Sequence, residues 1–145
     1  MRQQTSFIFD LDGTLTDSVY QNVFAWKTAL DSEDIPLAMW RIHRKIGMSG
    51  GLMLKTLARE TGLEIKSDQA KRLSDKHDKA YKDLQGQITA LPGAVELLDT
   101  LNRNQLKWCI ATSGGMDTAA INLKALGLDI AEVNLITRDD VKYGK

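Results

Sequence analysis

Phe7-Ile-Phe-Asp-Leu-Asp-Gly-Thr-Leu-Thr-Asp-Ser18 is the stretch that decides how this chain folds. Three apolar residues typical of a strand run directly into Asp10, and Asp12 and Gly13 follow. In open α/β sheets, ligands bind outside the carboxyl ends of the strands, so two carboxylates at that end predict a site. Successive side chains of an extended chain alternate in direction. Asp10 and Asp12 are therefore expected to face the same way if the strand continues.

Two carboxylates that share one crevice repel each other. They persist where a cation lies between them, or where one carries a proton and acts as an acid. Both conditions suit phosphoryl transfer, in which Mg²⁺ offsets the phosphate charge, one carboxylate attacks phosphorus and the other moves the proton. The alternative interpretation of Asp-x-Asp-Gly alone is an ordinary turn after a strand.

The segment Asp10-Leu-Asp-Gly-Thr-Leu-Thr-Asp-Ser18 resembles the first motif of the haloacid dehalogenase superfamily, in its phosphatase branch. The resemblance implies that Asp10 is the nucleophile that becomes an aspartyl phosphate. It also implies that Asp12 protonates the leaving group and then activates water, while its backbone carbonyl helps to hold Mg²⁺. Asp10 and Asp12 are thus the expected catalytic residues and the expected metal ligands. Dehalogenases and phosphonatases of the superfamily lack the second Asp, so Asp12 argues against both activities.

The composition sets limits on the class of protein. A chain of 145 residues, 43% hydrophobic and 26% charged, is long enough for one ordinary globular domain. Basic and acidic residues both number 19, so no net charge points to nucleic acid or an anionic membrane. A single Cys109 cannot form an internal disulfide, and neither a signal peptide nor a membrane-length apolar run is present. We expect a soluble cytoplasmic protein, monomeric or weakly dimeric.

The order of predicted elements indicates an interrupted α/β fold. A buried strand at residues 6–10 is followed by four helices, which begin near residues 18, 37, 52 and 67, with no strand between them. Further on, a buried strand at 106–111 and a weaker one at 132–136 alternate with helices. We expect a Rossmann-like parallel sheet made of residues 1–15 and 88–145, with right-handed crossovers. Residues 16–87 are expected to form an inserted helical unit.

A second candidate piece of the site is Thr112-Ser-Gly-Gly115, between a predicted strand and a helix. Hydroxyls and helix N-terminal N–H groups at such a place form an anion site, although an ordinary capping turn is the alternative. The family's second motif is an apolar strand that ends in Thr or Ser and binds the transferring phosphoryl group, and Ile110-Ala-Thr112 resembles it. Thr112 is therefore the expected phosphate ligand, with the backbones of Ser113 and Gly114 as supporting donors.

The last residues resemble the approach to the family's third motif, whose Lys anchors phosphate. Lys145 is the expected residue and Lys142 the second choice, while a solvated lysine is the alternative. The family's fourth motif, an acidic pair that completes the Mg²⁺ shell, is missing from this sequence. Asp139 and Asp140 are poor substitutes because they precede the lysine. We expect the chain to be a fragment of a longer protein; a complete chain with an impaired metal site is the alternative.

The helical insertion resembles the family's cap, which closes over the phosphate and excludes water. Its loop at residues 47–50 falls where related β-phosphoglucomutases carry a substrate-specificity loop that ends in a basic residue. Gly50 takes that place here, which weakens a mutase assignment. The candidate substrate contacts of the cap are Arg44, Gly47, Met48 and Ser49. For Arg44 and for Lys45 a solvated helix face is nevertheless the favoured interpretation.

The remaining polar and aromatic residues are interpreted as structural. We expect His77 to be a packed histidine, Cys109 to be buried, and the tryptophans Trp26, Trp40 and Trp108 to lie in the core. The expected protein is a Mg²⁺-dependent phosphatase of a small phosphorylated metabolite, of the phosphoglycolate phosphatase and β-phosphoglucomutase-like type. The alternatives are a sugar-phosphate mutase and an impaired domain that only binds phosphate or a partner. A receiver-like domain is disfavoured, since receivers carry the phosphorylated Asp on a later strand.

Overall fold

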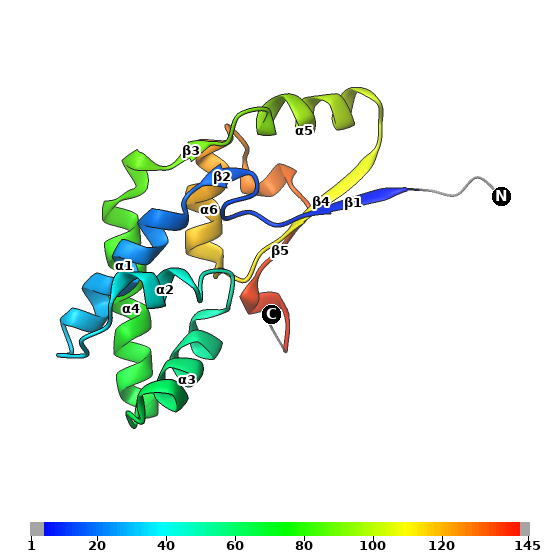
Figure 1. Cartoon of the computed structure of the whole chain (residues 1–145). Helices are drawn as coiled ribbons and strands as arrows, with labels where there is room; N and C mark the ends of the chain where they lie inside the picture. The colour runs from blue at the N-terminus through cyan, green and yellow to red at the C-terminus, as the bar shows by residue number, and fades with distance from the viewer. Residues whose placement is uncertain (1–4, 143–145) are drawn as a thin grey trace.

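The computed structural model describes residues 5–142, and its sheet has the predicted parallel arrangement (Figure 1). The three parallel strands stand in the order β1-β4-β5 and span Ser6–Phe9, Lys107–Ala111 and Leu135–Ile136. Two helices accompany the sheet, α5 (Ala94–Arg103) and α6 (Met116–Ala125). A parallel pairing of β4 with β5 requires a crossover, which α6 supplies. The predicted α/β class is confirmed.

One face of the sheet is covered and the other is open in the described part of the chain. Phe7 and Phe9 on β1 lie beside Trp108 and Ile110 on β4, and all four pack into the cluster that holds the apolar faces of α5 and α6. On the opposite face, the exposed fraction of Ile8 is 71%. The prediction that this strand is fully buried is therefore wrong for one face. Parallel sheets usually carry cover on both faces.

The helical insertion has an apolar core of its own. Its helices are α1 (Val19–Asp31), α2 (Met39–His43), α3 (Gly50–Thr61) and α4 (Ser67–Asp83), and a short 3₁₀ turn η1 (Gln85–Gln87) follows them. Helices α1 and α4 lie side by side (Figure 1). Trp26, Leu57 and Leu73 join in this core, separate from the cluster under the sheet. Helix α3 ends at Gly62, which has a left-handed φ of 73°.

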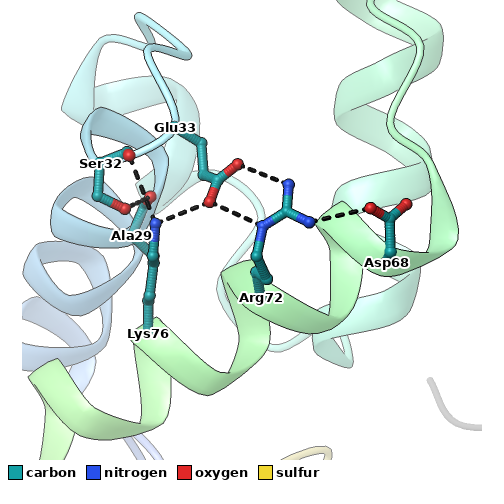
Figure 2. A network of polar contacts seen from close by, with 6 residues as sticks. All are labelled: Ala29, Ser32, Glu33, Asp68, Arg72 and Lys76. Carbon is teal, nitrogen blue, oxygen red and sulfur yellow. Dashed lines mark hydrogen bonds and ion pairs between the residues drawn. The ribbon is translucent and has the colours of Figure 1, made fainter.

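A network of ion pairs connects the loop after α1 with helix α4. Figure 2 shows the Glu33 carboxylate, in the loop after α1, between the Arg72 and Lys76 side chains of α4. The Glu33 to Arg72 distance is 3.0 Å and the Glu33 to Lys76 distance is 2.7 Å. Arg72 also reaches Asp68 one turn earlier, at 2.9 Å. These hydrogen bonds, that of Arg72 first, lower the pKa of Glu33 to about 2.

Two short strands pair where the chain leaves the sheet and where it returns. Strand β2 (Thr16–Asp17) runs antiparallel to β3 (Thr89–Ala90), and the Leu91 N–H donates to the Leu15 carbonyl at 2.9 Å. The sequence pattern did not indicate this ribbon. It brings both ends of the insertion to one place, so α1–α4 are attached to the rest of the chain through two adjacent segments.

Several local expectations are corrected by the structure. Ser18 directly precedes α1 without a capping bond from its side chain, and Lys66 precedes α4. Trp40 is 58% exposed and not in the core, and the guanidinium groups of Arg41 and Arg44 lie over its ring. Trp108 is half-buried on the covered face of the sheet, and Cys109 is half-buried on the face that the described residues leave open.

Candidate functional site

The two predicted carboxylates lie at the end of β1 and line one cavity. β1 ends at Phe9, so Asp10 is the first residue beyond the strand. The chain then turns tightly, because the Leu11 carbonyl accepts hydrogen bonds from three N–H groups, those of Thr14, Leu15 and Thr16, at 3.0–3.2 Å. Asp10 and Asp12 both face a cavity of about 320 Å³. The turn interpretation and the site interpretation are therefore compatible.

Gly13 makes this turn possible. Its φ is +72°, a left-handed conformation that side-chain-bearing residues adopt only with strain. A Cβ at this position would lie 2.7 Å from Cγ2 of Val19, in the first turn of α1. The glycine thus allows the first residues of α1 to approach the turn that holds Asp12.

Asp12 is held by hydrogen bonds to one of its carboxylate oxygens. Its Oδ1 accepts from Ser18 Oγ at 2.6 Å, from the Tyr81 hydroxyl at 3.3 Å and from Asn122 Nδ2 at 3.4 Å. Burial raises the pKa of Asp12 above its usual value, and the charge of Asp10 raises it further, while the three hydrogen bonds act in the opposite direction. A carboxyl group with a raised pKa beside a second carboxylate is suited to act as an acid.

The cavity lies between the inserted helices and the end of the sheet. From the sheet side it is lined by Asp10, Asp12, the turn of residues 113–118, Arg138 and Asp139. From the insertion it is lined by Asn22 and Trp26 of α1, residues 45–48, the start of α3, and Ser74, His77 and Asp78 of α4. A ligand in this cavity would contact both parts of the chain.

The predicted phosphate loop, residues 112–115, lies beside the cavity, but not all of its residues line it. Ser113 and Gly114 line the cavity, whereas Thr112 is buried and is not among the lining residues. The Thr112 hydroxyl oxygen accepts a hydrogen bond from the Gly114 N–H at 3.0 Å. A Cβ on Gly114 would lie 2.8 Å from Thr118 Oγ1, so only glycine fits there without rearrangement. Thr112 thus shapes the loop that Ser113 and Gly114 present.

The cation expected from the third motif falls outside the described residues, since Lys145 lies beyond residue 142. Lys142 is exposed and does not line the cavity. Arg138 does line it, and sequence reasoning had not singled it out. Its backbone N–H donates to the Gly114 carbonyl at 2.9 Å, which ties η3 (Arg138–Asp140) to the predicted phosphate loop.

The acids of η3 are engaged in local structure. Asp139 Oδ2 accepts from the Met116 N–H at the start of α6 at 2.9 Å. Asp140 accepts from the backbone N–H and the hydroxyl of Thr137, both at 2.8 Å, and these bonds hold its pKa below the usual value. Within residues 5–142 no group of three or more acidic, His or Cys side chains is arranged to hold a metal ion. The pair Asp10 and Asp12 fits Mg²⁺, which commonly uses one or two carboxylates together with water and substrate oxygens.

The candidate substrate contacts of the insertion, Arg44, Gly47, Met48 and Ser49, divide into two groups. Gly47 and Met48 line the cavity. Ser49 is buried and its carbonyl accepts from the Met53 N–H at 2.9 Å, and Arg44 is exposed with its guanidinium over the Trp40 ring. Neither Ser49 nor Arg44 lines the cavity.

Lys45 is a cavity residue that the sequence reasoning assigned to solvent. Lys45 is only 7% exposed, and its side-chain ammonium group forms an ion pair with Glu60 of α3 at 2.6 Å. The solvated interpretation of Lys45 is therefore wrong. No local pattern distinguished Lys45 from its exposed neighbour Arg44, since both lie off the apolar stripe Met39, Ile42 and Ile46 of the predicted second helix.

His77 is packed as expected and also lines the cavity. Its Nδ1 lies 2.9 Å from Asp78 Oδ1, its Nε2 lies 3.0 Å from Asn22 Oδ1, and its ring stacks on Trp26 with centroids 4.3 Å apart. Asn22 and Trp26 are one helical turn apart on α1, and Ser74 and Asp78 are one turn apart on α4. This helical spacing in the sequence could have identified the faces of α1 and α4 that line the cavity.

Comparisons with known proteins agree with the resemblance in the sequence. A family model described as haloacid dehalogenase-like hydrolase matches residues 5–145. Hexitol phosphatase A of Escherichia coli (strain K12) is 36% identical over 144 residues, which cover 96% of this chain and 62% of that protein. Beta-phosphoglucomutase of Bacillus subtilis (strain 168) is 32% identical over 111 residues, which cover 73% of this chain and 49% of that protein.

Solved structures resemble the fold closely. The crystal structure of a hydrolase from Pseudomonas syringae has a TM-score of 0.96 and 77% identity, and the match covers 98% of this chain and 65% of that one. Beta-phosphoglucomutase from Clostridium difficile, at 23% identity, shares the fold with a TM-score of 0.82 over 99% of this chain and 66% of its own. The chain thus spans less than two thirds of the curated relatives it matches. Within residues 5–142 no helix is long and apolar enough to cross a membrane.

Proposed function

Because this chain belongs to the haloacid dehalogenase-like hydrolase family, we propose that it forms the nucleophile-bearing part of a phosphatase that hydrolyses a small phosphorylated sugar or polyol. The observation that carries the proposal is the pair Asp10 and Asp12 on one cavity, with Asp12 half-buried and its pKa raised. A nucleophilic carboxylate needs an acid beside it, and this pair supplies both. The name of the relative hexitol phosphatase A supports the substrate class.

The chemistry follows from the two carboxylates. An Asp10 oxygen attacks phosphorus in line, the bond from phosphorus to the ester oxygen breaks, and protonated Asp12 gives its proton to the leaving alcohol. Asp12 is then a carboxylate and takes a proton from water, which attacks the phosphorus of the aspartyl phosphate. Inorganic phosphate leaves, Asp10 is regenerated as a carboxylate, and Asp12 is protonated again.

Further residues of this chain are proposed to bind the phosphoryl group and the metal. Ser113 and Gly114 are the proposed phosphate contacts from the turn before α6, with Thr112 shaping that turn. Lys145 keeps the role that the resemblance gives it. Asp10 and Asp12 would hold Mg²⁺, which when bound offsets the charge of the phosphate and makes phosphorus more susceptible to attack.

We also propose that residues 16–87 act as a cap over the site. Two observations support this role: the insertion has its own apolar core, and it supplies one wall of the cavity. The paired strands β2 and β3 are the proposed hinge, since they are the adjacent entry and exit segments of the insertion. A cap of this kind excludes water from the reacting phosphate.

A sugar-phosphate mutase is the second candidate, and Lys45 is the observation that favours it. This buried cation at the cavity wall could contact a second phosphate, in place of the basic residue that Gly50 replaces. The relationship to beta-phosphoglucomutase of B. subtilis is consistent with this candidate. A mutase would need a bisphosphate activator and would lose its phosphoryl group to water slowly.

The test is Mg²⁺-dependent hydrolysis of p-nitrophenyl phosphate and of hexitol phosphates, by the protein and by its Asp10→Asn variant. We expect turnover without a bisphosphate activator and its loss in the variant, with an unchanged circular dichroism spectrum. Turnover that the variant retains would refute Asp10 as the nucleophile. Activity that requires a bisphosphate would favour the mutase.

A further inference from the structure

A fully buried polar cluster surrounds one oxygen of Asp12. Its members are Thr16 of β2, Ser18 directly after β2, Tyr81 of α4 and Asn122 of α6. The exposed fraction of each is 0%. Burying polar side chains is costly unless each donor finds an acceptor. The directions of the hydrogen bonds in this cluster are therefore restricted.

Asn122 determines where the Tyr81 proton points. The Asn122 Nδ2 donates to the Tyr81 hydroxyl oxygen at 2.8 Å and to the Thr118 carbonyl at 3.0 Å. Its Oδ1 accepts from Thr16 Oγ1 at 3.0 Å. Two acceptors lie within reach of the Tyr81 proton: Asn122 Oδ1 at 3.2 Å, on the same amide that already donates to the Tyr81 oxygen, and Asp12 Oδ1 at 3.3 Å. A charged carboxylate is the stronger acceptor, so the Tyr81 hydroxyl donates to Asp12.

The two carboxylate oxygens of Asp12 have different surroundings. Among residues 5–142, the polar contacts of the Asp12 carboxylate all go to Oδ1: hydrogen bonds from Ser18 and Tyr81, and a longer 3.4 Å contact from Asn122 Nδ2, whose two protons point to Tyr81 and Thr118. Asp12 nevertheless lines the cavity. Fixing Oδ1 on the buried side leaves Oδ2 as the oxygen available to a ligand.

We propose that Tyr81, oriented by Asn122, is a positioning residue that holds the Asp12 carboxyl group with Oδ2 toward the leaving group. This inference rests on the proposed phosphatase function. Tyr81 does not itself line the cavity, so it acts through Asp12.

The contact joins the two parts of the chain. Tyr81 belongs to the inserted helices and Asn122 to the sheet side, where α4 lies against α6 (Figure 1). The Tyr81 ring also stacks on His77, at 5.9 Å between centroids, and His77 stacks on Trp26 of the cavity wall. Tyr81 can contact Asp12 only while α4 packs against α6. The orientation of the Asp12 carboxyl group therefore depends on the position of the inserted helices relative to the sheet.

The test compares leaving groups in a Tyr81→Phe variant. The p-nitrophenolate ion leaves without a proton, whereas the alkoxide of glycerol 2-phosphate needs one. We expect kcat/KM for glycerol 2-phosphate to fall about tenfold or more and that for p-nitrophenyl phosphate to stay within about twofold, since general acid catalysis is worth at least this much. The ratio kcat/KM covers only the steps up to phosphoryl transfer to Asp10, so the later role of Asp12 as base does not enter. Tyr20→Phe, at an exposed tyrosine of α1, is the matched control and is expected to change neither value.

An equal loss for both substrates would indicate a merely structural role for Tyr81, and no loss for either would also overturn the proposal. A second readout does not depend on turnover: three-bond couplings of the Asp12 side chain in the metal-free protein, measured by NMR. We expect one χ1 rotamer in the wild type and in Tyr20→Phe, and averaging in Tyr81→Phe. A single rotamer in Tyr81→Phe would refute the inference. Absence of hydrolysis in the wild type would count against the proposed function, while the couplings would still decide the role of Tyr81.

Discussion

Ser18 Oγ donates a 2.6 Å hydrogen bond to Asp12 Oδ1 and makes no capping bond to α1. Serine before a helix normally satisfies an N–H group of the first turn. Here the hydroxyl satisfies a buried carboxylate instead, and the approach of α1 to the turn at Gly13 makes this contact possible. The start of the inserted helices is therefore built around the proposed acid.

The burial of Asp12 predicts a conflict between stability and activity at this position. Asp12→Asn removes a charge that burial and Asp10 both disfavour, while the amide oxygen can still accept from Ser18. We expect the variant to melt a few degrees higher at pH 7 and to lose at least about 100-fold in turnover of alkyl phosphates. Thermal unfolding and steady-state kinetics measure the two effects. A lower melting temperature would show that the charge is favourable where it stands.

Gly13 and Gly62 form a matched pair for testing the turn. Both have a left-handed φ, +72° and +73°, but a Cβ meets Val19 Cγ2 at 2.7 Å only at Gly13, and nothing within 4 Å at Gly62. We expect Gly62→Ala to lower the free energy of unfolding by about 1 kcal/mol, from backbone strain alone. Gly13→Ala should cost about 3 kcal/mol, because the clash adds to the strain. Chemical denaturation of the two variants gives the difference, and equal losses would contradict the close approach of α1.

Lys45 and Arg44 are adjacent cations with opposite surroundings. Lys45 is buried at the cavity wall, whereas Arg44 is exposed over Trp40. We expect Lys45→Met to raise the KM for a phosphorylated sugar about tenfold, which is the usual loss for one charged hydrogen bond. Arg44→Met should leave it unchanged. An equal KM for both variants and the wild type would show that Lys45 serves only its ion pair with Glu60.

The Glu33 network predicts a stability difference that depends on pH. The folded state lowers the pKa of Glu33 from 4.5 to about 2, so its contribution is complete above pH 4.5 and is lost as the pH falls towards 2. We expect Glu33→Gln to lower the melting temperature by about 2 °C at pH 7, a small effect because Arg72 and Lys76 are largely exposed. The difference from the wild type should shrink below pH 4.5 and in high salt.

Glu64→Gln is the control for this prediction, because Glu64 is an exposed acid beyond the end of α3. Its melting temperature should equal that of the wild type at every pH. A Glu33→Gln difference that stays constant between pH 7 and pH 2 would mean that the carboxylate charge plays no part.

The sequence by itself predicted the strands of the sheet, most of the helices and the neighbouring carboxylates Asp10 and Asp12. Asp10, Asp12 and Gly13 stand within a few residues of one another, directly after a strand, so a local pattern was enough to place them together. Helical spacing likewise identified the helices and the α/β class, since it depends on neighbours three or four positions apart. The turn at 112–115 was placed in the same way, between a strand and a helix, and its binding of phosphate stays a prediction.

Only the tertiary structure decided which distant side chains complete the site. Tyr81 and Asn122 are 69 and 110 positions from Asp12, and they meet it because α4 packs against both α1 and α6. Lys45 is buried and Arg44 exposed for the same kind of reason, and Ile8 is exposed although its strand is apolar. Burial and contact depend on what packs against a residue, and that partner is not encoded in the residue's own neighbourhood along the chain.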